Sequence, residues 1–229
     1  MTAGISLVQA KQGSGTTSPV TVTLTATGAG NALVVCVGEG NSTTSPTVSG
    51  MTLGGAAGNL AAVPGAAVAN NAEANCEIWT DQSCAGGQTS LAVSFNLGTG
   101  AGNGYCVDVF EFAAVLGTGA VDGKNAAGAA SGAWSSGSSG ALAQANEAAV
   151  GVGCAIGSAG APTLTGPSSP WNNSAQLSAA RTAMIAGYQI LSSAAGLSYA
   201  GTTSTGKVGA AIVTLKAAAS GGLLLLKFP

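Results

Sequence analysis

The sequence of 229 residues contains no histidine and very few charged side chains. Without histidine, neither a Ser-His-Asp triad nor histidine-based acid–base catalysis can form. Charged residues make up 6% of the chain, whereas about 25% is ordinary for a soluble protein. The surface must therefore consist largely of Ser, Thr, Asn, Gln, Gly and Ala. Because a nearly neutral surface favours association, the composition predicts a subunit of an assembly rather than a free cytosolic enzyme.

Further absences exclude other classes of protein. The basic residues are few and scattered, so we expect no phosphate-neutralising patch and no nucleic-acid partner; they are Lys11, Lys124, Arg181, Lys207, Lys216 and Lys227. The first residues lack a basic segment followed by a long apolar one, so we expect no signal peptide. No run of about 18 consecutive apolar residues occurs, so we expect no membrane-spanning helix and no membrane partner.

The chain has an odd number of cysteines, and most lie in strand-like runs: Cys36, Cys76, Cys84, Cys106 and Cys154. A disulfide framework is typical of small secreted domains, and the spacing fits no CxxC metal pair. The favoured interpretation is free, buried thiols that act as small hydrophobic side chains in a protein made in a reducing cytoplasm. We expect no metal or other cofactor.

What is present is a series of short strand patterns separated by Gly-rich turns. These predict an all-β fold, an antiparallel β-sandwich of jelly-roll-like type with about ten or eleven short strands and long Gly/Ala/Ser loops. One domain is predicted over residues 1–217. The expected strands are Ile5–Gln9, Ser18–Thr27, Ala32–Val37, Val48–Leu53, Cys76–Gln82, Thr89–Leu97, Tyr105–Phe112, an edge strand around Trp134, Glu147–Ile156, Thr182–Leu191 and Lys207–Lys216.

The strand patterns also indicate position within the sandwich. Ser18–Thr27 alternates apolar residues with threonines, which predicts one buried face and one wet or partner-facing face. Ala32–Val37 and Tyr105–Phe112 are apolar on both faces and should be central. The segments NALVVCVG (31–38) and NEAAVGVG (146–153) resemble one another, which suggests equivalent strands of a pseudo-symmetric sandwich. The residues of 54–71 and 117–140 are mostly Gly, Ala, Ser and Asn, and we expect irregular connections there.

Two glycine-rich motifs come close to nucleotide-binding signatures. Gly201–Lys207 reads GTTSTGK, but Val208 stands where Ser or Thr should ligate magnesium, and a strand follows where a helix should begin. GTGAGNG at 98–104 joins two strands and fits no dinucleotide fingerprint. We expect both to be loops.

The carboxylates are the residues that could form a reaction centre. Glu77 and Asp81 share one face of a strand but lie about 13 Å apart at about 3.3 Å per residue, beyond the roughly 5–9.5 Å used by glycosidases. Asp108 and Glu111 fall on opposite faces. A cross-strand pair of Glu77 with Asp108 or Glu111 stays open. A calcium site using Asp81, Asp122 or loop asparagines lacks a supporting motif. The sequence therefore predicts no catalytic residues.

Two further groups of residues are candidates for contacts. Trp79, Trp134 and Trp171 could line a sugar-binding surface, but core plugs or interface anchors are the favoured interpretation. Residues 218–229 form a hydrophobic tail that contains Leu223, Leu224, Leu225, Leu226 and Phe228. This tail could complete the subunit's own sheet, or it could be a clip that docks on a neighbouring subunit.

The order of segments carries a resemblance: ISLVQ, GNALVVCV, EIWTDQSCAGGQTSLAVSF, VDVFEFAAVLGTGAVD, NEAAVGVG and GAAIVTLK. Over most of residues 1–217 the sequence resembles a loose group of jelly-roll-like β-sandwich proteins encoded by tailed bacteriophages and found in phage-related bacterial loci. The shared motifs are packing patterns without catalytic residues.

The resemblance implies a non-enzymatic virion structural protein made in the host cytoplasm. The first hypothesis is a capsid decoration or cement protein that binds the phage major capsid protein or other virion proteins as a homo-oligomer such as a trimer. The alternative is a minor tail or fibre-type protein that binds a host surface glycan.

Overall fold

The computed structural model describes residues 4–41, 46–70, 74–97, 102–130, 132–204 and 206–219. All regular secondary structure in these ranges is β-strand, and all strand pairs are antiparallel. The predicted all-β class and antiparallel β-sandwich are confirmed. These ranges hold no helix that is long and apolar enough to cross a membrane.

The strands divide into two sets of nine. The first set is β1 (Ser6–Gly15), β2 (Val20–Thr23), β3 (Ala32–Gly40), β4 (Val48–Leu53), β5 (Ala56–Ala57), β6 (Ala61–Asn70), β7 (Ala74–Asp81), β8 (Ser90–Phe95) and β9 (Gly104–Ala113). The second set is β10 (Val121–Ala129), β11 (Ala133–Ser135), β12 (Glu147–Ile156), β13 (Leu164–Thr165), β14 (Asn172–Asn173), β15 (Leu177–Ala179), β16 (Thr182–Leu191), β17 (Ala200–Thr203) and β18 (Lys207–Lys216).

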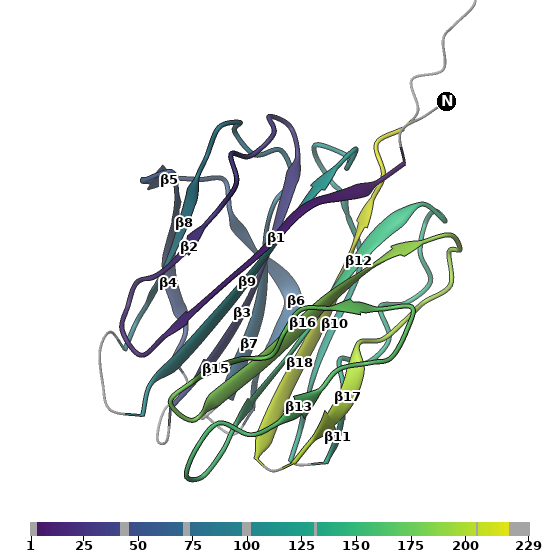
Figure 1. The fold of residues 1–229 in the computed structure, drawn as a ribbon. Coiled ribbons are helices and arrows are strands. Elements are labelled where there is room, and N and C mark those ends of the chain that lie inside the picture. The colour runs from purple at the N-terminus through teal and green to yellow at the C-terminus, as the bar shows by residue number, and fades with distance from the viewer. Residues whose placement is uncertain are drawn as a thin grey trace, which may run out of the picture.

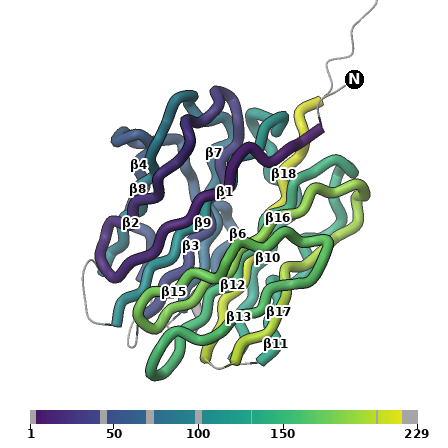
Figure 2. Tube along the Cα trace, viewed as in Figure 1, coloured from purple at the N-terminus to yellow at the C-terminus, as the bar shows by residue number. Residues whose placement is uncertain are grey.

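Four sheets stack in layers (Figure 1; Figure 2 traces the same view as a tube). The first outer sheet has the order β2-β8-β4-β5, and the first inner sheet β1-β9-β3-β7-β6. The second inner sheet has the order β10-β18-β12-β16-β14, with β15 also paired to β16, and the second outer sheet β11-β17-β13. One hydrophobic core lies under each outer sheet, and a third lies between the two inner sheets.

The two halves of the chain follow the same path between their inner and outer sheets. In the first half β1 is in the inner sheet, β2 in the outer, β3 in the inner, β4 and β5 in the outer, β6 and β7 in the inner, β8 in the outer and β9 in the inner. The last strand returns to lie between β1 and β3, while β8 lies between β2 and β4. This is the order of a jelly roll, a folded ribbon wrapped into two facing sheets.

Adding nine to each strand number reproduces the second half from the first. The inner order β1-β9-β3-β7-β6 becomes β10-β18-β12-β16-β15, and β2-β8-β4 becomes β11-β17-β13. The one departure is β14, which pairs with β16 although its counterpart β5 pairs with β4. The protein therefore contains two jelly-roll halves in tandem.

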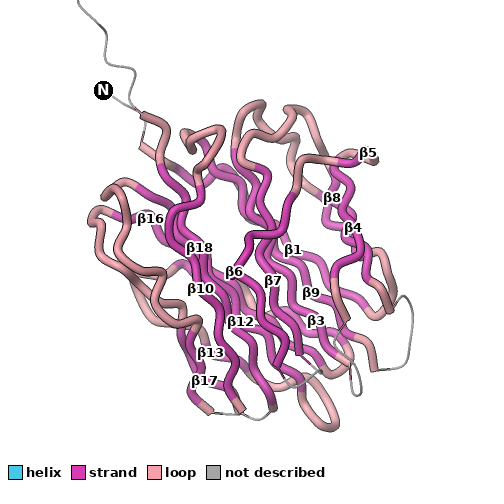
Figure 3. Tube along the Cα trace, turned by 180° about the vertical axis from the view of Figure 1, so that it is seen from behind, coloured by secondary structure: helices cyan, strands magenta, loops and turns pink. Residues whose placement is uncertain are grey.

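The two halves meet through their inner sheets, which Figure 3 shows from behind, and the contacts between them have a pseudo-twofold arrangement. Strand β3 packs against its own counterpart β12, β9 packs against β16, and β7 packs against β18. At the sides, β6 packs against β10 and β1 against β15. Each contact between the halves has a mate under the exchange of halves, as in an isologous dimer.

The two similar segments, residues 31–38 and 146–153, fall on equivalent strands, because they lie mostly within β3 and β12. The sequence alignment of these two segments, however, differs by one residue from the alignment of the strands in space. The sequence alignment places Val34 opposite Ala149, but Val34 lies in the core between the inner sheets, whereas Ala149 packs on the opposite face of its sheet. Since side chains alternate along a strand, a one-residue slip exchanges the faces.

The shared core between the inner sheets widens along the strands. At one end, glycines bring the sheets close: a Cβ built on Gly38 would lie 2.9 Å from the Sγ of Cys154. At the other end Phe110 and Phe112 fill the space, each with its ring centroid 5.9 Å from that of Tyr188. The shared core therefore tapers from aromatic side chains to glycine.

Burial on both faces explains which strands read as central. β3 and β9 are covered by the first outer sheet on one face and by the second inner sheet on the other, as predicted for residues 32–37 and 105–112. In residues 18–27 the alternation holds through Thr25 and then reverses. Ala26 is exposed and Thr27 is buried, because the Thr27 hydroxyl donates to the Ala85 carbonyl and accepts from the Gln88 N–H.

Two predictions about connections are wrong. Residues 54–71 contain β5 and β6, and residues 117–140 contain β10 in addition to β11, which is the edge strand predicted around Trp134. The described chain therefore has eighteen strands instead of about ten or eleven. Gly and Ala have low intrinsic strand preference, and these strands form because each pairs with a neighbour already fixed in a sheet. The five cysteines are free and buried, as predicted.

We predict that Gly151→Ala destabilises the protein by about 1–3 kcal/mol, through overpacking. The added Cβ would lie 2.2 Å from Cγ of Tyr199, so the ring must leave its contacts under the second outer sheet. Urea unfolding measures the change. The control is Gly50→Ala, where nothing lies within 4 Å of the new Cβ and the free energy of unfolding should change by less than about 1 kcal/mol. Equal effects of the two substitutions would contradict this packing.

Candidate functional site

The carboxylates considered as a reaction centre are not brought together. Glu77 and Asp81 lie on β7, and Asp108 and Glu111 lie on opposite faces of β9, as predicted. The suggested pair of Glu77 with Asp108 or Glu111 is wrong, because β3 lies between β7 and β9 and Val37 of β3 pairs with both Glu77 and Val107. Adjacent strands are about 4.8 Å apart, so two such steps separate these backbones.

Glu77 instead has an acidic neighbour that sequence reasoning missed, Glu39 of β3. The Asn75 Nδ2 donates to Oε2 of Glu39 at 3.0 Å and to Oε1 of Glu77 at 2.7 Å. The Nε1 of Trp79 donates to Oε2 of Glu77 at 2.8 Å. Burial first, and the nearby Glu77 carboxylate second, raise the pKa of Glu39 well above its ordinary value. The signal available in the sequence was a single acid within an otherwise apolar strand.

A protonated acid beside a carboxylate is a pairing that glycosidases use. Glu39, however, is fully buried, and neither of the two clefts described below is lined by Glu39 or Glu77. The network joins β3 to β7 in the core under the first outer sheet. Its geometry supports a role in holding the strands together.

The acids of β9 are also engaged with neighbouring segments. Glu111 accepts hydrogen bonds from the Gly28 N–H at 2.8 Å and from the side chains of Gln9 and Asn31. Asp108 accepts from Nε2 of Gln12 at 3.1 Å. Burial raises the pKa of Asp108 to about 6, while hydrogen bonding from Ser174 and Gln12 limits the rise.

A second acidic pair lies near the start of β12, and sequence reasoning did not single it out. Burial of Glu147, and then the neighbouring Asp122 carboxyl, raise the pKa of Glu147 to about 7. The Oδ1 of Asp122 lies 4.0 Å from Nζ of Lys216, and its Oδ2 accepts from the Ala143 N–H at 2.5 Å. This pair connects β10, β12 and β18 at one end of the second inner sheet.

The tryptophans pack into the cores under the two outer sheets. Trp134 is 3% exposed, and its ring centroid lies 5.6 Å from that of Tyr199; Trp171 meets the same ring at 4.8 Å. Trp79 is half-buried against the core under the first outer sheet. Trp134 and Trp171 share the core under the second outer sheet, whereas Trp79 lies under the first, so the three side chains line no common surface.

The remaining sequence candidates have the following positions. Of the motif at 201–207, residues 201–203 lie in β17 and Lys207 begins β18, so most of the expected loop is strand. Of the motif at 98–104, only 102–104 are described, and Gly104 begins β9. Asp81 and Asp122 belong to no group of three or more potential metal ligands within the described ranges. The tail residues Leu223–Leu226 and Phe228 lie outside the described residues.

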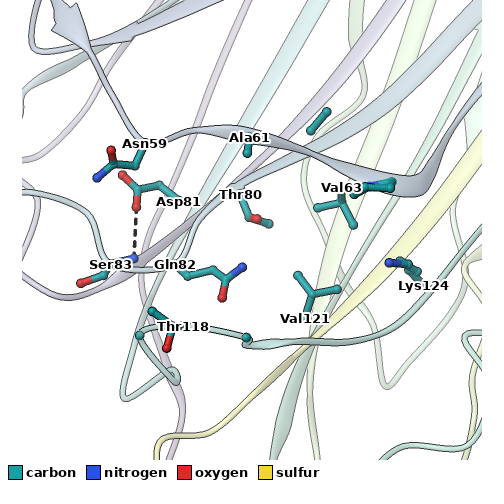
Figure 4. A pocket seen from close by; sticks show the side chains of 14 residues that line it. Asn59, Ala61, Val63, Thr80, Asp81, Gln82, Ser83, Thr118, Val121 and Lys124 are labelled. Carbon is teal, nitrogen blue, oxygen red and sulfur yellow. Dashed lines mark hydrogen bonds between the residues drawn. The ribbon is translucent and has the colours of Figure 1, made fainter.

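A cleft of about 520 Å³ lies where the two halves meet. Its lining mixes polar and apolar residues and comes from three separate stretches (Figure 4): Asn59 with Ala61 to Pro64, Thr80 to Ser83, and the segment of Gly117, Thr118, Gly119, Val121 and Lys124. A smaller cleft of about 160 Å³ adjoins it and shares Asn59 and Asp81. No sequence motif marks this site, because two of its three stretches fall in segments that read as irregular.

Comparison of the chain with protein families, with curated proteins and with solved structures found no match. The likeness to phage β-sandwich proteins therefore rests on the residue patterns alone and stays a prediction.

We predict that the protein is more stable at pH 5 than at pH 8. Glu39, Asp108 and Glu147 have pKa values raised by burial, so each binds its proton more tightly when folded than when unfolded. Their stabilising contribution is complete below the unfolded pKa of about 4 and is lost as pH rises through their folded values. We expect a loss of about 2 kcal/mol or more, measured by urea unfolding across this range.

No histidine contributes to the change in stability between pH 5 and pH 8, because the chain contains none. Glu147→Gln removes one of the buried titrating groups, so this variant should show a shallower pH dependence and a relative gain at pH 8. A stability that is flat or rises with pH would show that these carboxyls are not buried as described.

Proposed function

We propose that the protein is a non-enzymatic structural component of a tailed-phage virion, with capsid decoration or cementing as its role. The observation that carries the proposal is the placement of charge. The acids that could form a reaction centre are buried in hydrogen-bond networks between strands, whereas the exposed face of the first outer sheet presents small uncharged side chains. The resemblance of the segment order to phage β-sandwich proteins supports the same role.

The first outer sheet offers a surface suited to docking on a protein shell. Thr21 of β2 pairs with Ala92 of β8, which pairs in turn with Thr52 of β4, so these side chains form one cross-strand row. Thr21 and Thr52 are exposed, and so is Thr23, which pairs with Ser90. A flat hydroxyl-bearing face can hydrogen-bond to a partner at low desolvation cost. We propose this threonine-rich face as the side that contacts the major capsid protein.

Assembly of the proposed homo-oligomer, such as a trimer, would need apolar contact area from another source. Within the described residues the only large hydrophobic side chains that are exposed are Val8 and Ile190. The leucine-rich tail is therefore the proposed clip between subunits. A run of apolar residues that adds a strand to, or enters a groove of, a neighbour would supply the missing area.

We predict that the protein co-purifies with capsids in a fixed, high copy number. Deleting Leu223–Pro229 should reduce incorporation into particles at least several-fold, because the clip between subunits is removed. Quantitative mass spectrometry of purified particles measures both. Replacing Leu223–Leu226 with serines keeps the chain length and should reproduce the loss. Unchanged incorporation of both variants would contradict the clip.

The second candidate, a minor tail or fibre-type protein that binds a host surface glycan, is supported by the cleft between the halves, whose lining combines hydrogen-bonding and small apolar residues. It predicts a handful of copies located at the tail instead of many on the shell. Reproducible hydrolysis of a polysaccharide that is lost on changing Glu77 or Glu111 would defeat both non-enzymatic candidates.

A further inference from the structure

The large cleft marks a place where the two halves differ. Strand β6, which forms one wall, spans ten residues, whereas its counterpart β15 spans three. On the opposite side of the molecule, the widest part of the shared core is filled by Phe110, Phe112 and Tyr188. On the β6 side Thr80 lies in β7 two residues beyond Ile78, a member of the shared core. The edge of the shared core that borders the cleft therefore carries a polar side chain, Thr80.

The walls of the cleft are held in place by hydrogen bonds. The segment 114–120 is tied to β18, because the Leu116 N–H donates to the Lys216 carbonyl at 3.0 Å and the Lys216 N–H donates to the Ala120 carbonyl at 2.8 Å. Across the cleft, the Ala120 N–H donates to Oε1 of Gln82 at 2.7 Å. This bond leaves the Nε2 of Gln82 as a donor. The cleft is thus formed before any ligand binds, which lowers the cost of binding.

The lining combines hydrogen-bonding groups with small apolar ones. Oδ1 of Asp81 accepts from the Ser83 N–H at 3.1 Å, while its Oδ2 has no such partner within the described part of the chain. Figure 4 shows this carboxylate between Asn59 and Ser83, with Gln82 and Thr118 on the same side of the cleft. Ala61, Val63 and Val121 supply apolar surface.

We propose that this cleft binds a neutral saccharide of one or two sugar rings. A carboxylate, amides and hydroxyls can pair with the hydroxyl groups of a sugar, while the small apolar residues can meet its C–H faces. Asp81 at one end and Lys124 on the rim offset each other in charge, which disfavours a strongly anionic ligand. The volume is within the roughly 300–1,000 Å³ of small-molecule sites, and the adjoining smaller cleft extends the groove past Asp81.

The absence of an aromatic ring from the lining residues removes the stacking that strengthens many sugar sites. We therefore expect weak binding, with a Kd on the order of 1–10 mM. The inference does not depend on whether the protein sits on the capsid or on the tail. If the protein fails to bind sugar, its copy number in the particle is unaffected. The proposed sugar site and the proposed virion role can therefore be contradicted independently.

The test is a titration of the ¹⁵N-labelled full-length protein with glucose, galactose, N-acetylglucosamine, lactose and cellobiose, followed by amide chemical shifts. At least one sugar should bind, with shifts concentrated at residues 80–83 and 117–121. Asp81→Asn should weaken binding about tenfold, a loss that corresponds to about 1.4 kcal/mol, because the amide replaces one of the two acceptor oxygens with an NH₂ donor and removes the charge.

A matched pair of threonine variants keeps the test independent of folding. Thr118→Val on the cleft rim should weaken binding at least threefold. Thr165 is another exposed threonine, on β13, and Thr165→Val should leave binding unchanged. The proposal is overturned if none of the five sugars shifts the cleft amides at about 50 mM, several times the expected Kd, if shifts arise only elsewhere, or if the two threonine variants bind alike.

Discussion

The close approach of the two inner sheets is the constraint on which the rest of the structure depends. At the narrow end of the shared core a Cβ on Gly40 would lie 2.4 Å from the hydroxyl oxygen of Thr182, and a Cβ on Gly209 would lie 3.0 Å from Val68. Only hydrogen fits at such points without a shift of the neighbouring sheet. The same requirement explains why alanine and cysteine are so common on these faces: the stack has three internal interfaces to fill within a single chain, and small side chains let the layers meet.

Burial in a four-layer stack also decides where the charges can lie. The central inner strands β3, β9 and β12 have almost no solvent-facing side, so an acid on them must be paired with amides or lose its charge. Glu111 is paired with amide groups. For Glu39, burial raises the pKa, which favours the uncharged form. The acids therefore serve as connectors between strands, and the surface is left with hydroxyl and methyl groups. A charge-poor exterior and a glycine-rich interior are two results of one architecture.

The tandem jelly rolls explain which features the sequence could predict. Strands with clear alternation, such as β2, or with apolar residues on both faces, such as β3 and β9, were found because their patterns report burial directly. Strands β6 and β10 were missed because Ala and Gly carry no periodic signal, and their structure comes from pairing with β7 and β18. The cleft was missed for the same reason, since β6 and β10 form its sides. The similarity between residues 31–38 and 146–153 located the equivalent strands. Its alignment was one residue off, because the burial of strand faces, and not residue identity, sets which positions are equivalent.

The central claim is that the two halves form one cooperative unit through the shared core. Hydrogen exchange in increasing urea tests it most directly, by comparing peptides from β3 in the first half with peptides from β12 in the second. Because β3 packs against β12, the account predicts that both strands lose protection at the same urea concentration and with the same dependence on urea. Loss of protection in one strand while the other stays protected would show that the halves are independent domains, and would contradict the account.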